Sequence, residues 1–439
     1  PILELKMTNE ENKLEKIVSL CKRRGFVFQG SEIYGGLAGT WDYGHYGDAL
    51  VNNIKNLWWK TFVMSRDDMY GIKSAILMNQ KTWEASGHLD GFSDPAIKCP
   101  HCNTIWRSDA LIETQIPTNE GVYLCPNGHC RKPIGKKEDI LSKSERFNML
   151  LKTSVGAVKD ISSITYLRPE TAQGMFVNFK NYIDSYHPKL PFGIAQVGKA
   201  FRNEIAPRDF LFRSREFEQM EVEYFVKPEK WEESFEGWRT IMLDWCSKIG
   251  LKKVHELEVP AEDRAHYSKR TIDFEFNYPF GKGELYGLAY RTDFDLKVHA
   301  AKSGASLEFL EEDGNKFIPH VIEPSFGVDR TVLAILTDAY TEDEMNGEQR
   351  VYLKFTPKIA PVKVAVFPLL KNKVELVKKA QEIYRKIKDE FLDFGWQVEF
   401  DDNGNIGKRY RRQDEIGTPL CVTVDFDTLE KKAGVTLRD

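Results

Sequence analysis

The chain has 439 residues, and its charge is nearly balanced, with 62 Lys and Arg against 66 Asp and Glu for a formal net charge of −4. Its content of 41% hydrophobic and 29% charged residues excludes a disordered or fibrous chain and indicates a globular protein of about two or three domains. No run of about 18 apolar residues predicts a membrane span, and no segment resembles a signal peptide, so we expect a cytoplasmic protein that contacts no membrane. Because the net charge does not favour nucleic-acid binding, only a local basic surface could provide it.

The first part of the chain predicts two helices around a glycine-rich segment. Apolar residues at helical spacing favour helices over residues 12–25 and 49–62, and the first is expected to stop at Gly25. The intervening residues 26–47 are dense in glycine and aromatic residues. Residues 92–140 hold two cysteine pairs and many turn residues, which indicates an insertion.

The central part of the chain predicts a sheet. Strand-like runs with few intervening helices occupy residues 192–204, 215–226, 271–278, 284–291 and 317–323. A helix is predicted from Val328 to about Tyr340. This pattern favours an α+β fold with an antiparallel sheet and flanking helices.

Strands and helices alternate in the last part of the chain, beyond a Pro-containing linker near residues 356–361. Strand and helix patterns follow one another at residues 362–367, 373–391, 397–400, 406–415 and 420–426. Such a βαβαβ series predicts a separate, small α/β domain.

The first motif with chemical content is a charged hairpin, in which the run FRNE ends one predicted strand and the run RSREFEQME begins the next. It places Arg202 before the loop and Arg213 on it, so that two planar guanidinium groups can bind the oxygens of a bent triphosphate. Phe217 on the returning strand can stack on an adenine, and Glu204 can accept a hydrogen bond from its amino group. The alternative is an exposed hairpin with surface ion pairs, since alternating charges on a strand are common.

A second motif, EPSFGVDR, closes the last predicted strand at residues 323–330. Gly327 permits close approach of the backbone, and Arg330 opens the following helix. Taken alone, this pattern is better explained as an arginine in the first turn of a helix. Two such motifs in this order, with a predicted sheet between them, favour a nucleotide site.

In this order the two motifs resemble motifs 2 and 3 of the class II aminoacyl-tRNA synthetases. Residues 48–63 resemble the motif 1 helix at the dimer interface of that class, although a generic amphipathic helix fits them equally well. The resemblance implies that Arg202 stabilises the α-phosphate and that Arg213 and Arg330 hold the γ-phosphate, which makes Arg202 and Arg330 the candidate catalytic residues. The further ATP contacts that it implies are Asn203, Glu204, Phe212, Phe217, Glu284, Leu285 and Gly327, with Glu284 also on a catalytic Mg²⁺.

Longer runs resemble the glycyl-tRNA synthetases of the dimeric (α2) type, found in bacteria and eukaryotes. They include WDYG at 41–44, WEASGH at 83–88, RPETAQG at 168–174, RTDFDL at 291–296 and the tail at 406–419. The resemblance covers the chain from near residue 15 to its end. It implies ATP-dependent activation of glycine to glycyl-adenylate, transfer of glycine to tRNA(Gly), and a homodimer.

The resemblance also implies a pocket for glycine. Its expected members are Arg107, Glu170, Glu221, Arg291, Glu323 and Ser325. Glycine offers only an ammonium and a carboxylate, so several carboxylates would hold the ammonium, and a full pocket would exclude larger amino acids by steric clash. Because buried carboxylates repel one another, we expect at least one of the three glutamates to have a raised pKa in the empty site.

Two short cysteine loops in the insertion resemble a zinc ribbon. The candidate zinc ligands are Cys99, Cys102, Cys125 and Cys130, with His101 and His129 as possible competitors because the second loop is longer than usual. Such an ion would brace the insertion and take no part in the chemistry. The alternative is a set of four reduced free thiols.

The predicted organisation is therefore a class II synthetase core plus an anticodon-binding domain. Residues 1–91 would form the N-terminal part of the catalytic domain with motif 1, 92–145 the zinc-braced insertion, 146–355 the catalytic domain with motifs 2 and 3, and 356–439 the α/β anticodon-binding domain. Members of the family usually continue with another helix, so a domain truncated at its C-terminus is one reading.

A basic cluster in the tail could contact tRNA. It consists of Lys408, Arg409, Arg411 and Arg412 together with Tyr410, a mixture that suits phosphate contact and base stacking. A solvated helix face paired with the acidic residues that follow explains the cluster about as well.

Two rival functions stay open at this point. The first is a non-catalytic RNA-binding relative with a synthetase fold. The second is a class II synthetase for another small amino acid. The presence of Arg202, Arg213 and Arg330 favours an enzyme, and the runs at 168–174 and 323–327 favour glycine.

Overall fold

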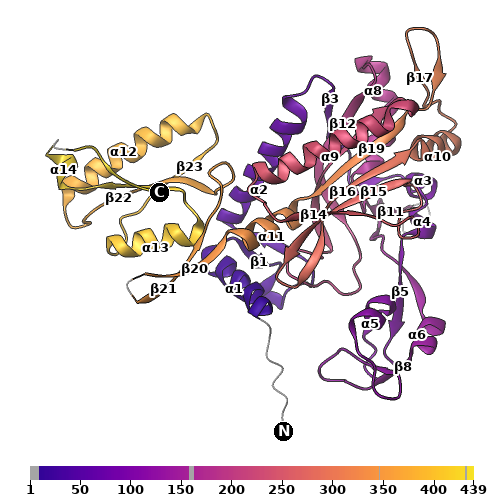
Figure 1. Ribbon diagram of the computed structural model, residues 1–439, viewed down its shortest axis with the longest axis horizontal. Coiled ribbons are helices and arrows are strands. Elements are labelled where there is room, and N and C mark those ends of the chain that lie inside the picture. The colour runs from indigo at the N-terminus through magenta and orange to yellow at the C-terminus, as the bar shows by residue number, and fades with distance from the viewer. Residues whose placement is uncertain (1–8, 158–162, 346, 431–432) are drawn as a thin grey trace.

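The computed structural model describes residues 9–157, 163–345, 347–430 and 433–439. Figure 1 shows a central body built on a twisted sheet, a small lobe that projects from one end of it, and an α/β unit on the opposite side. Among the described residues, no helix is long and apolar enough to cross a membrane.

A seven-stranded sheet forms the centre of the molecule, in the order β14-β15-β16-β19-β13-β12-β3. Its neighbours pair antiparallel, as predicted, except that the edge strand β3 runs parallel to β12. The strands are β3 (Met69–Ile72), β12 (Phe192–Phe201), β13 (Glu216–Val226), β14 (Val254–Glu258), β15 (Arg270–Tyr278), β16 (Gly281–Thr292) and β19 (His320–Gly327).

One face of this sheet is covered by three helices, α2 (His45–Trp59), α9 (Trp231–Lys248) and α11 (Val328–Ala339). Side chains along a strand alternate between the two faces, so on β13 Met220, Val222 and Tyr224 enter the core against these helices. The alternate residues Phe217, Gln219 and Glu221 of β13 face the opposite side. The predicted helix over 49–62 is confirmed as the end of α2 together with a π-helical turn over Lys60–Met64.

Smaller elements complete the central body. Their bounds are α1 (Asn9–Arg24), β1 (Val27–Gln29), β2 (Trp41–Tyr43), β4 (Leu77–Met78), α3 (Gln80–Ala85), α4 (His88–Gly91), β10 (Lys152–Ser154), β11 (Ile164–Leu167), α7 (Ala172–Phe176), α8 (Phe179–Tyr186), α10 (Phe294–Ser303), β17 (Phe309–Leu310), β18 (Lys316–Phe317), β20 (Tyr340–Met345) and β21 (Glu348–Leu353), with 3₁₀ turns at Glu32–Tyr34 and Pro228–Lys230. Helix α1 stops where predicted, since Gly25 follows it at a φ of +73° that favours glycine.

The projecting lobe has its own small core. It contains the three-stranded sheet β6-β5-β9, the hairpin β7-β8 and two short helices that pack Ile97, Leu111, Tyr123 and Ile140 together. Its elements are β5 (Ser93–Lys98), β6 (Ile105–Arg107), α5 (Ser108–Thr114), β7 (Val122–Leu124), β8 (Pro133–Lys136), α6 (Lys137–Lys143) and β9 (Glu145–Asn148). Figure 1 shows this lobe connected to the central body through β5 and its neighbours.

The C-terminal unit has the predicted alternation of strands and helices. Strand β22 is buried on both faces: Val364 and Val366 pack on the side of α12, whereas Ala365 and Phe367 pack on the side of α13. This explains why the run at 362–367 is apolar except for Lys363, whose buried ammonium donates to the backbone carbonyl oxygens of Pro357, Lys358 and Ala360. The elements are β22 (Val362–Pro368), α12 (Val374–Leu392), β23 (Gln397–Phe400), α13 (Ile406–Ile416), β24 (Leu420–Val424), α14 (Phe426–Leu429) and β25 (Thr436–Arg438), and the sheet order is β23-β22-β24-β25.

Candidate active site

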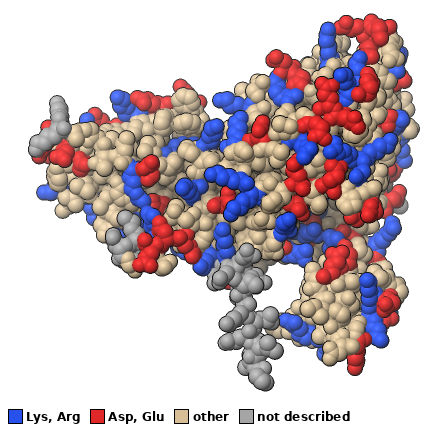
Figure 2. Space-filling view, viewed as in Figure 1, with Lys and Arg blue, Asp and Glu red and all other residues tan. Residues whose placement is uncertain are grey.

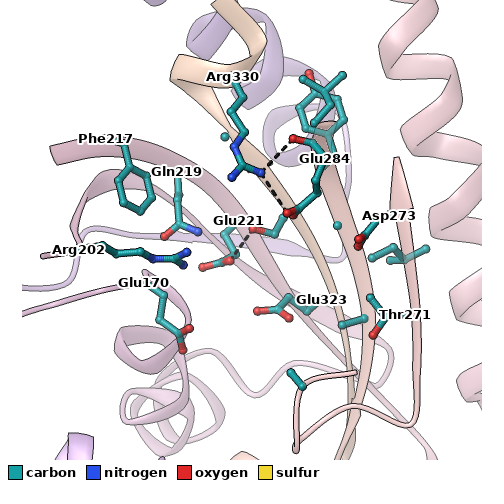
Figure 3. A pocket seen from close by; sticks show the side chains of 18 of the residues that line it. Glu170, Arg202, Phe217, Gln219, Glu221, Thr271, Asp273, Glu284, Glu323 and Arg330 are labelled. Carbon is teal, nitrogen blue, oxygen red and sulfur yellow. Dashed lines mark hydrogen bonds and ion pairs between the residues drawn. The ribbon is translucent and has the colours of Figure 1, made fainter. Parts of the chain in front are cut away.

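A cavity of about 390 Å³ opens on the sheet face opposite the three helices. Strands β13, β16 and β19 form its floor, and residues from the β12–β13 loop and the start of α11 form its walls. Figure 3 shows Arg330 at one end of this pocket, Arg202 at its side, and the carboxylates of Glu170, Glu221 and Glu323 toward the other end. The pocket therefore has an acidic end, away from Arg330, where three carboxylates lie together.

The Arg330 side chain lies across the upper end of the pocket. Its Nη1 is 3.0 Å from Oε2 of Glu284 on β16, and its guanidinium lies over the ring of Phe212 at 4.4 Å from the centroid. Burial lowers the pKa of Arg330, but the Glu284 charge outweighs it and leaves this pKa raised, so the side chain stays charged. Arg330 thus connects the start of α11 to the hairpin loop, where its Nε donates a hydrogen bond to the carbonyl oxygen of Phe212.

Arg202 follows β12 and lies beside the Phe217 ring. Its Nε donates a hydrogen bond to the carbonyl oxygen of Pro169 at 3.1 Å, and its guanidinium lies 5.2 Å from the Phe217 centroid. It also lies 5.4 Å from the ring of Phe92, next to the first strand of the projecting lobe. Phe217 and Arg202 both line the pocket.

The hairpin loop brings Arg213 close to Glu204, with Nη1 of Arg213 3.6 Å from Oε2 of Glu204. Burial raises the pKa of Glu204, and the charges of Arg213 and Arg202 oppose this shift. At the loop tip, Asp209 and Phe210 have φ values of +59° and +56°, a backbone conformation that is unusual for these residues and concentrates at functional sites.

The glycine-rich segment before α2 supports this loop. Gly39 has a φ of +76°, and a Cβ at this position would lie 2.7 Å from Pro207 in the loop. Its carbonyl oxygen accepts a hydrogen bond from the backbone N–H of Arg215, and the Arg215 guanidinium also donates to the carbonyl oxygen of Glu204. Arg215, which no sequence motif singled out, therefore holds the loop in place.

The predicted glycine glutamates come together from three elements. Glu170 precedes α7, Glu221 lies on β13 and Glu323 on β19, and all three are nearly buried and line the pocket. Glu221 accepts a hydrogen bond from the Ser325 hydroxyl at 2.7 Å and another from Thr171. Side chains that lie far apart in the sequence therefore share one acidic end of the pocket.

The pKa values in this acidic end are shifted in opposite directions. Burial raises the pKa of Glu221, and the neighbouring charge of Glu170 raises it further. Burial also acts on Glu170, but the nearby His88 and Arg291 outweigh it and leave the pKa of Glu170 lowered. The expectation that at least one glutamate has a raised pKa is confirmed.

Arg291 lies behind Glu323 and not on the pocket surface. It is 1% exposed, and its guanidinium donates to Asp295 at 2.7 and 2.8 Å and to Oε1 of Glu323 at 2.8 Å. It also stacks on the ring of Tyr267, 3.7 Å from the centroid. The residue predicted to contact glycine thus holds a carboxylate that faces the pocket.

Two other predicted contacts also lie outside the pocket lining. Arg107, at the end of β6 in the projecting lobe, pairs with Asp94 at 3.1 Å and with Asp109. Asn203 uses its backbone N–H to donate to the carbonyl oxygen of Met149 at 2.8 Å. The remaining predicted ATP contacts line the pocket, namely Glu204, Phe212, Arg213, Phe217, Glu284, Leu285 and Gly327.

The structure adds pocket residues that the sequence analysis missed. Gln219 lies between Phe217 and Glu221 on the same face of β13, so the two-residue period of a strand could have found it. Asp273 on β15 pairs with Gly287 of β16 and lines the pocket, and its pKa is raised to about 7 by burial and by the charge of Glu284. No local motif indicates Asp273.

The four cysteines of the projecting lobe form one cluster. Their sulfur atoms all lie within 4.8 Å of one another, with Sγ–Sγ distances of 3.9 Å for Cys99 and Cys130 and 3.6 Å for Cys102 and Cys125. None of the four is joined in a disulfide. His101 and His129 are exposed and lie outside this set.

Comparisons with known proteins decide the family. The tRNA synthetase class II core domain (G, H, P, S and T) matches residues 158–339, and the anticodon binding domain matches residues 363–439. A glycine–tRNA ligase of Clostridium acetobutylicum is 49% identical over 98% of this chain and 95% of its own length. Those of Caldanaerobacter subterraneus and Thermobifida fusca are 49% and 48% identical, over 97% and 99% of this chain. The chain belongs to the glycine–tRNA ligase family.

The fold of this glycine–tRNA ligase family member is also found in a solved structure. A prolyl-tRNA synthetase from Giardia lamblia in complex with prolyl-adenylate has a TM-score of 0.68 at 15% identity, covering 96% of this chain and 70% of that one. This likeness, together with the two family matches, confirms the class II core and the anticodon-binding domain predicted from the sequence.

Proposed function

We propose that the described pocket is where this glycine–tRNA ligase activates glycine with ATP, before transfer of glycine to tRNA. The observation that carries the proposal is that one cavity brings together three guanidinium groups, those of Arg202, Arg213 and Arg330, and the buried carboxylates of Glu170, Glu221 and Glu323. A triphosphate matches the guanidinium groups, and an ammonium matches the three carboxylates. The carboxylate of glycine would then lie between them, next to the α-phosphate.

In the first step, an oxygen of the glycine carboxylate attacks the α-phosphorus of ATP, and the bond to the pyrophosphate leaving group breaks. Arg202 stabilises the charge that develops on the α-phosphate, and Arg213 and Arg330 hold the γ-phosphate. The Phe217 ring stacks on the adenine, and Glu204 accepts a hydrogen bond from its amino group. Positioning and charge stabilisation suffice, so no side-chain nucleophile is needed.

The pocket residues also fit the Mg²⁺ that class II activation uses. Glu284 and Asp273 present carboxylate oxygens to the triphosphate end, and oxygen ligands of this kind are what Mg²⁺ prefers. When bound, the ion neutralises charge on the phosphate oxygens. Glu284 itself pairs with Arg330, so it orients that guanidinium as well.

We assign selection of glycine to the acidic end of the pocket. Glu170, Glu221 and Glu323 would surround the ammonium, with Ser325 holding Glu221 in place. Charged groups buried to this degree have little freedom to move aside. An amino acid with a side chain would therefore meet a clash at its Cβ, and this discrimination is sharper than that of an oversized pocket.

The four-cysteine cluster fits a structural zinc ion. A tetrahedral ion with zinc–sulfur bonds of about 2.3 Å separates its sulfur atoms by about 3.8 Å, close to the observed 3.6 and 3.9 Å. We propose that Cys99, Cys102, Cys125 and Cys130 hold it. Such a closed site would brace the projecting lobe, which has only a small apolar core of its own.

We further propose that the enzyme is a homodimer and acts in the cytoplasm, where tRNA is charged. Exposed apolar side chains near the start of the chain support an interface between two copies. Ile33 is 88% exposed, Tyr34 87% and Leu37 56%, all within the glycine-rich segment. This grouping is typical of a surface that is covered in an assembly.

For tRNA binding, the structure separates the members of the predicted basic cluster. Arg409 is 1% exposed and donates to the backbone carbonyl oxygens of Pro368, Asp402 and Gly404, so it holds the fold of the domain. Arg412 pairs with Asp401 at 2.6 Å. We therefore assign phosphate contact to exposed positions such as Lys408.

The experiment that tests the proposed function is exchange of pyrophosphate into ATP, with each of the twenty amino acids supplied separately. Exchange with glycine alone supports both the activation and its selectivity. Absence of exchange from folded, zinc-loaded wild-type protein would overturn the catalytic role of the pocket and favour the RNA-binding alternative. The Arg330→Ala variant serves as the matched control, because it removes one phosphate contact and leaves the acidic end in place.

A further inference from the structure

Glu223 lies next to the carboxylates of the pocket but does not line the pocket itself. Strand β13 carries it two residues after Glu221, so both side chains leave the same face of the sheet. The register pairs Glu221 with Ser325 on β19, and this places Glu223 opposite Glu323. Carboxylate oxygens of Glu221, Glu223 and Glu323 all lie within 4.8 Å of one another.

The Glu223 side chain is fully buried, and neither of its carboxyl oxygens has a hydrogen-bond partner in the described part of the chain. By contrast, Glu221 accepts from the Ser325 hydroxyl, and Glu323 accepts from Arg291. A buried carboxylate without a cation or a donor is costly, so such a group takes up a proton. A proton on one of two facing carboxyl groups also turns two acceptors into a donor and an acceptor.

The charges around Glu223 determine which member of the pair keeps the proton. Burial raises the pKa of Glu223 well above its usual value, and the charge of Glu323 raises it further. Burial also raises the pKa of Glu323, to about 8, but Arg291 donates directly to Glu323 and opposes this shift, so Glu323 is the member of the pair that ionises first, and the ammonium of bound glycine favours its ionised form. The charged groups that face Glu223 are Glu221 on β13, Arg291 on β16, Asp295 on α10 and Glu323 on β19.

We propose that Glu223 is a positioning residue for glycine, whose protonated carboxyl group donates a hydrogen bond to the ionised Glu323. This inference rests on the proposed role of the pocket in glycine activation. Arg291 and Glu223 then hold Glu323 from two sides, and the pair carries one negative charge. The substrate ammonium thus meets a carboxylate whose orientation is set before binding, which lowers the cost of ordering it.

Two substitutions at this position separate the hydrogen bond from simple packing. Glu223→Gln keeps a donor of the same shape, and we expect its KM for glycine to stay within about 3-fold of the wild type. Glu223→Leu fills the space without a donor. Because one hydrogen bond to Glu323 is lost, we expect its KM for glycine to rise by about 10-fold or more, whereas its KM for ATP should be unchanged. Val222→Ala, on the opposite face of β13, controls for a packing change in the same strand.

An infrared difference spectrum between the wild type and Glu223→Gln, recorded without glycine at neutral pH, reports the proton directly. We expect the carbonyl band of one protonated carboxylic acid, present only in the wild type and shifted in D₂O. Absence of this band, or a KM for glycine raised as much by Gln as by Leu, overturns the proposal. The spectrum can be recorded whether or not the protein is active, so it tests the proton on Glu223 separately from the proposed function. If the wild type shows the band but catalyses no pyrophosphate exchange, the protonation of Glu223 is supported and the function of the pocket is refuted.

Discussion

The buried arginine behind the pocket offers a quantitative test of the site. Arg291 is 1% exposed, and three of its hydrogen bonds join it to Asp295 and Glu323. Arg291→Met replaces the guanidinium with an apolar side chain and leaves two buried carboxylates without their cation. Removal of one partner of a buried ion pair costs about 3–5 kcal/mol, so we expect the free energy of unfolding of the catalytic core to fall by about that amount.

The substitution should also weaken the binding of glycine, because Glu323 depends on Arg291 for its orientation. We expect the KM for glycine to rise in Arg291→Met. Arg291→Lys keeps the charge but not the bidentate contact with Asp295, so its free energy of unfolding should lie between those of the wild type and Arg291→Met. Adding Asp295→Asn to Arg291→Met removes one unpaired charge and should restore part of the stability.

Urea unfolding followed by tryptophan fluorescence suits this test, since Trp58, Trp238 and Trp245 are all buried in the central core. Arg270→Met is the matched control: Arg270 lies on the neighbouring strand β15, its side chain is 25% exposed, and it pairs with glutamates at the surface. Exposed pairs of this kind contribute about 0–1 kcal/mol. If Arg291→Met costs no more than Arg270→Met, the reasoning about the buried arginine is wrong.

Four further predictions concern the chemistry, the metal, the pH dependence and the assembly. Arg202→Ala and Arg330→Ala should each lower the rate of glycine-dependent pyrophosphate exchange by about 10²–10³-fold with an unchanged melting temperature, and a near-normal rate in either would remove that residue from the mechanism. Metal analysis should find one zinc ion per chain in the wild type and none in Cys99→Ser. Limited proteolysis should cut residues 93–148 in Cys99→Ser but not in the wild type. A zinc-free protein that resists proteolysis as well as the wild type would contradict a bracing role. Burial and the neighbouring carboxylates raise the pKa of Asp273 from 3.8 to about 7, so the folded protein retains a proton there that the unfolded chain releases, and stability should fall as the pH rises between these values. Urea midpoints should show that Asp273→Asn flattens this slope, and an unaltered slope would show that another group causes it. Finally, Ile33→Asp should shift the sedimentation of the protein from dimer to monomer, and an unchanged dimer would place the interface elsewhere.

Local patterns in the sequence were sufficient for much of the fold. Strand-like runs of residues predicted β12, β13, β15, β16 and β19, and the largely apolar run at 362–367 predicted β22. The short spacing within each cysteine loop likewise predicted a cluster of four sulfur atoms. These features depend on residues a few positions apart, whose relative placement the backbone geometry of a strand or turn already determines.

Roles that depend on burial were harder to predict. Arg291 and Arg409 both look like ligand contacts in the sequence, because a charged side chain in a motif is usually exposed. The structure buries both, Arg291 against Asp295 and Glu323, and Arg409 against backbone carbonyl oxygens. A guanidinium has five donors in a fixed plane, so it can hold a fold or a substrate equally well, and only the surrounding acceptors distinguish the two roles.

The sequence by itself therefore determined the family, the two nucleotide motifs and the elements that carry them. Only the tertiary structure decided that Glu223 faces Glu323, that Arg291 lies behind the pocket, and that Asp273 lines the same pocket as Glu284. Glu223 and Glu323 lie on neighbouring strands that are a hundred residues apart in the chain. Their register is set by the packing of the whole sheet, which no local pattern specifies.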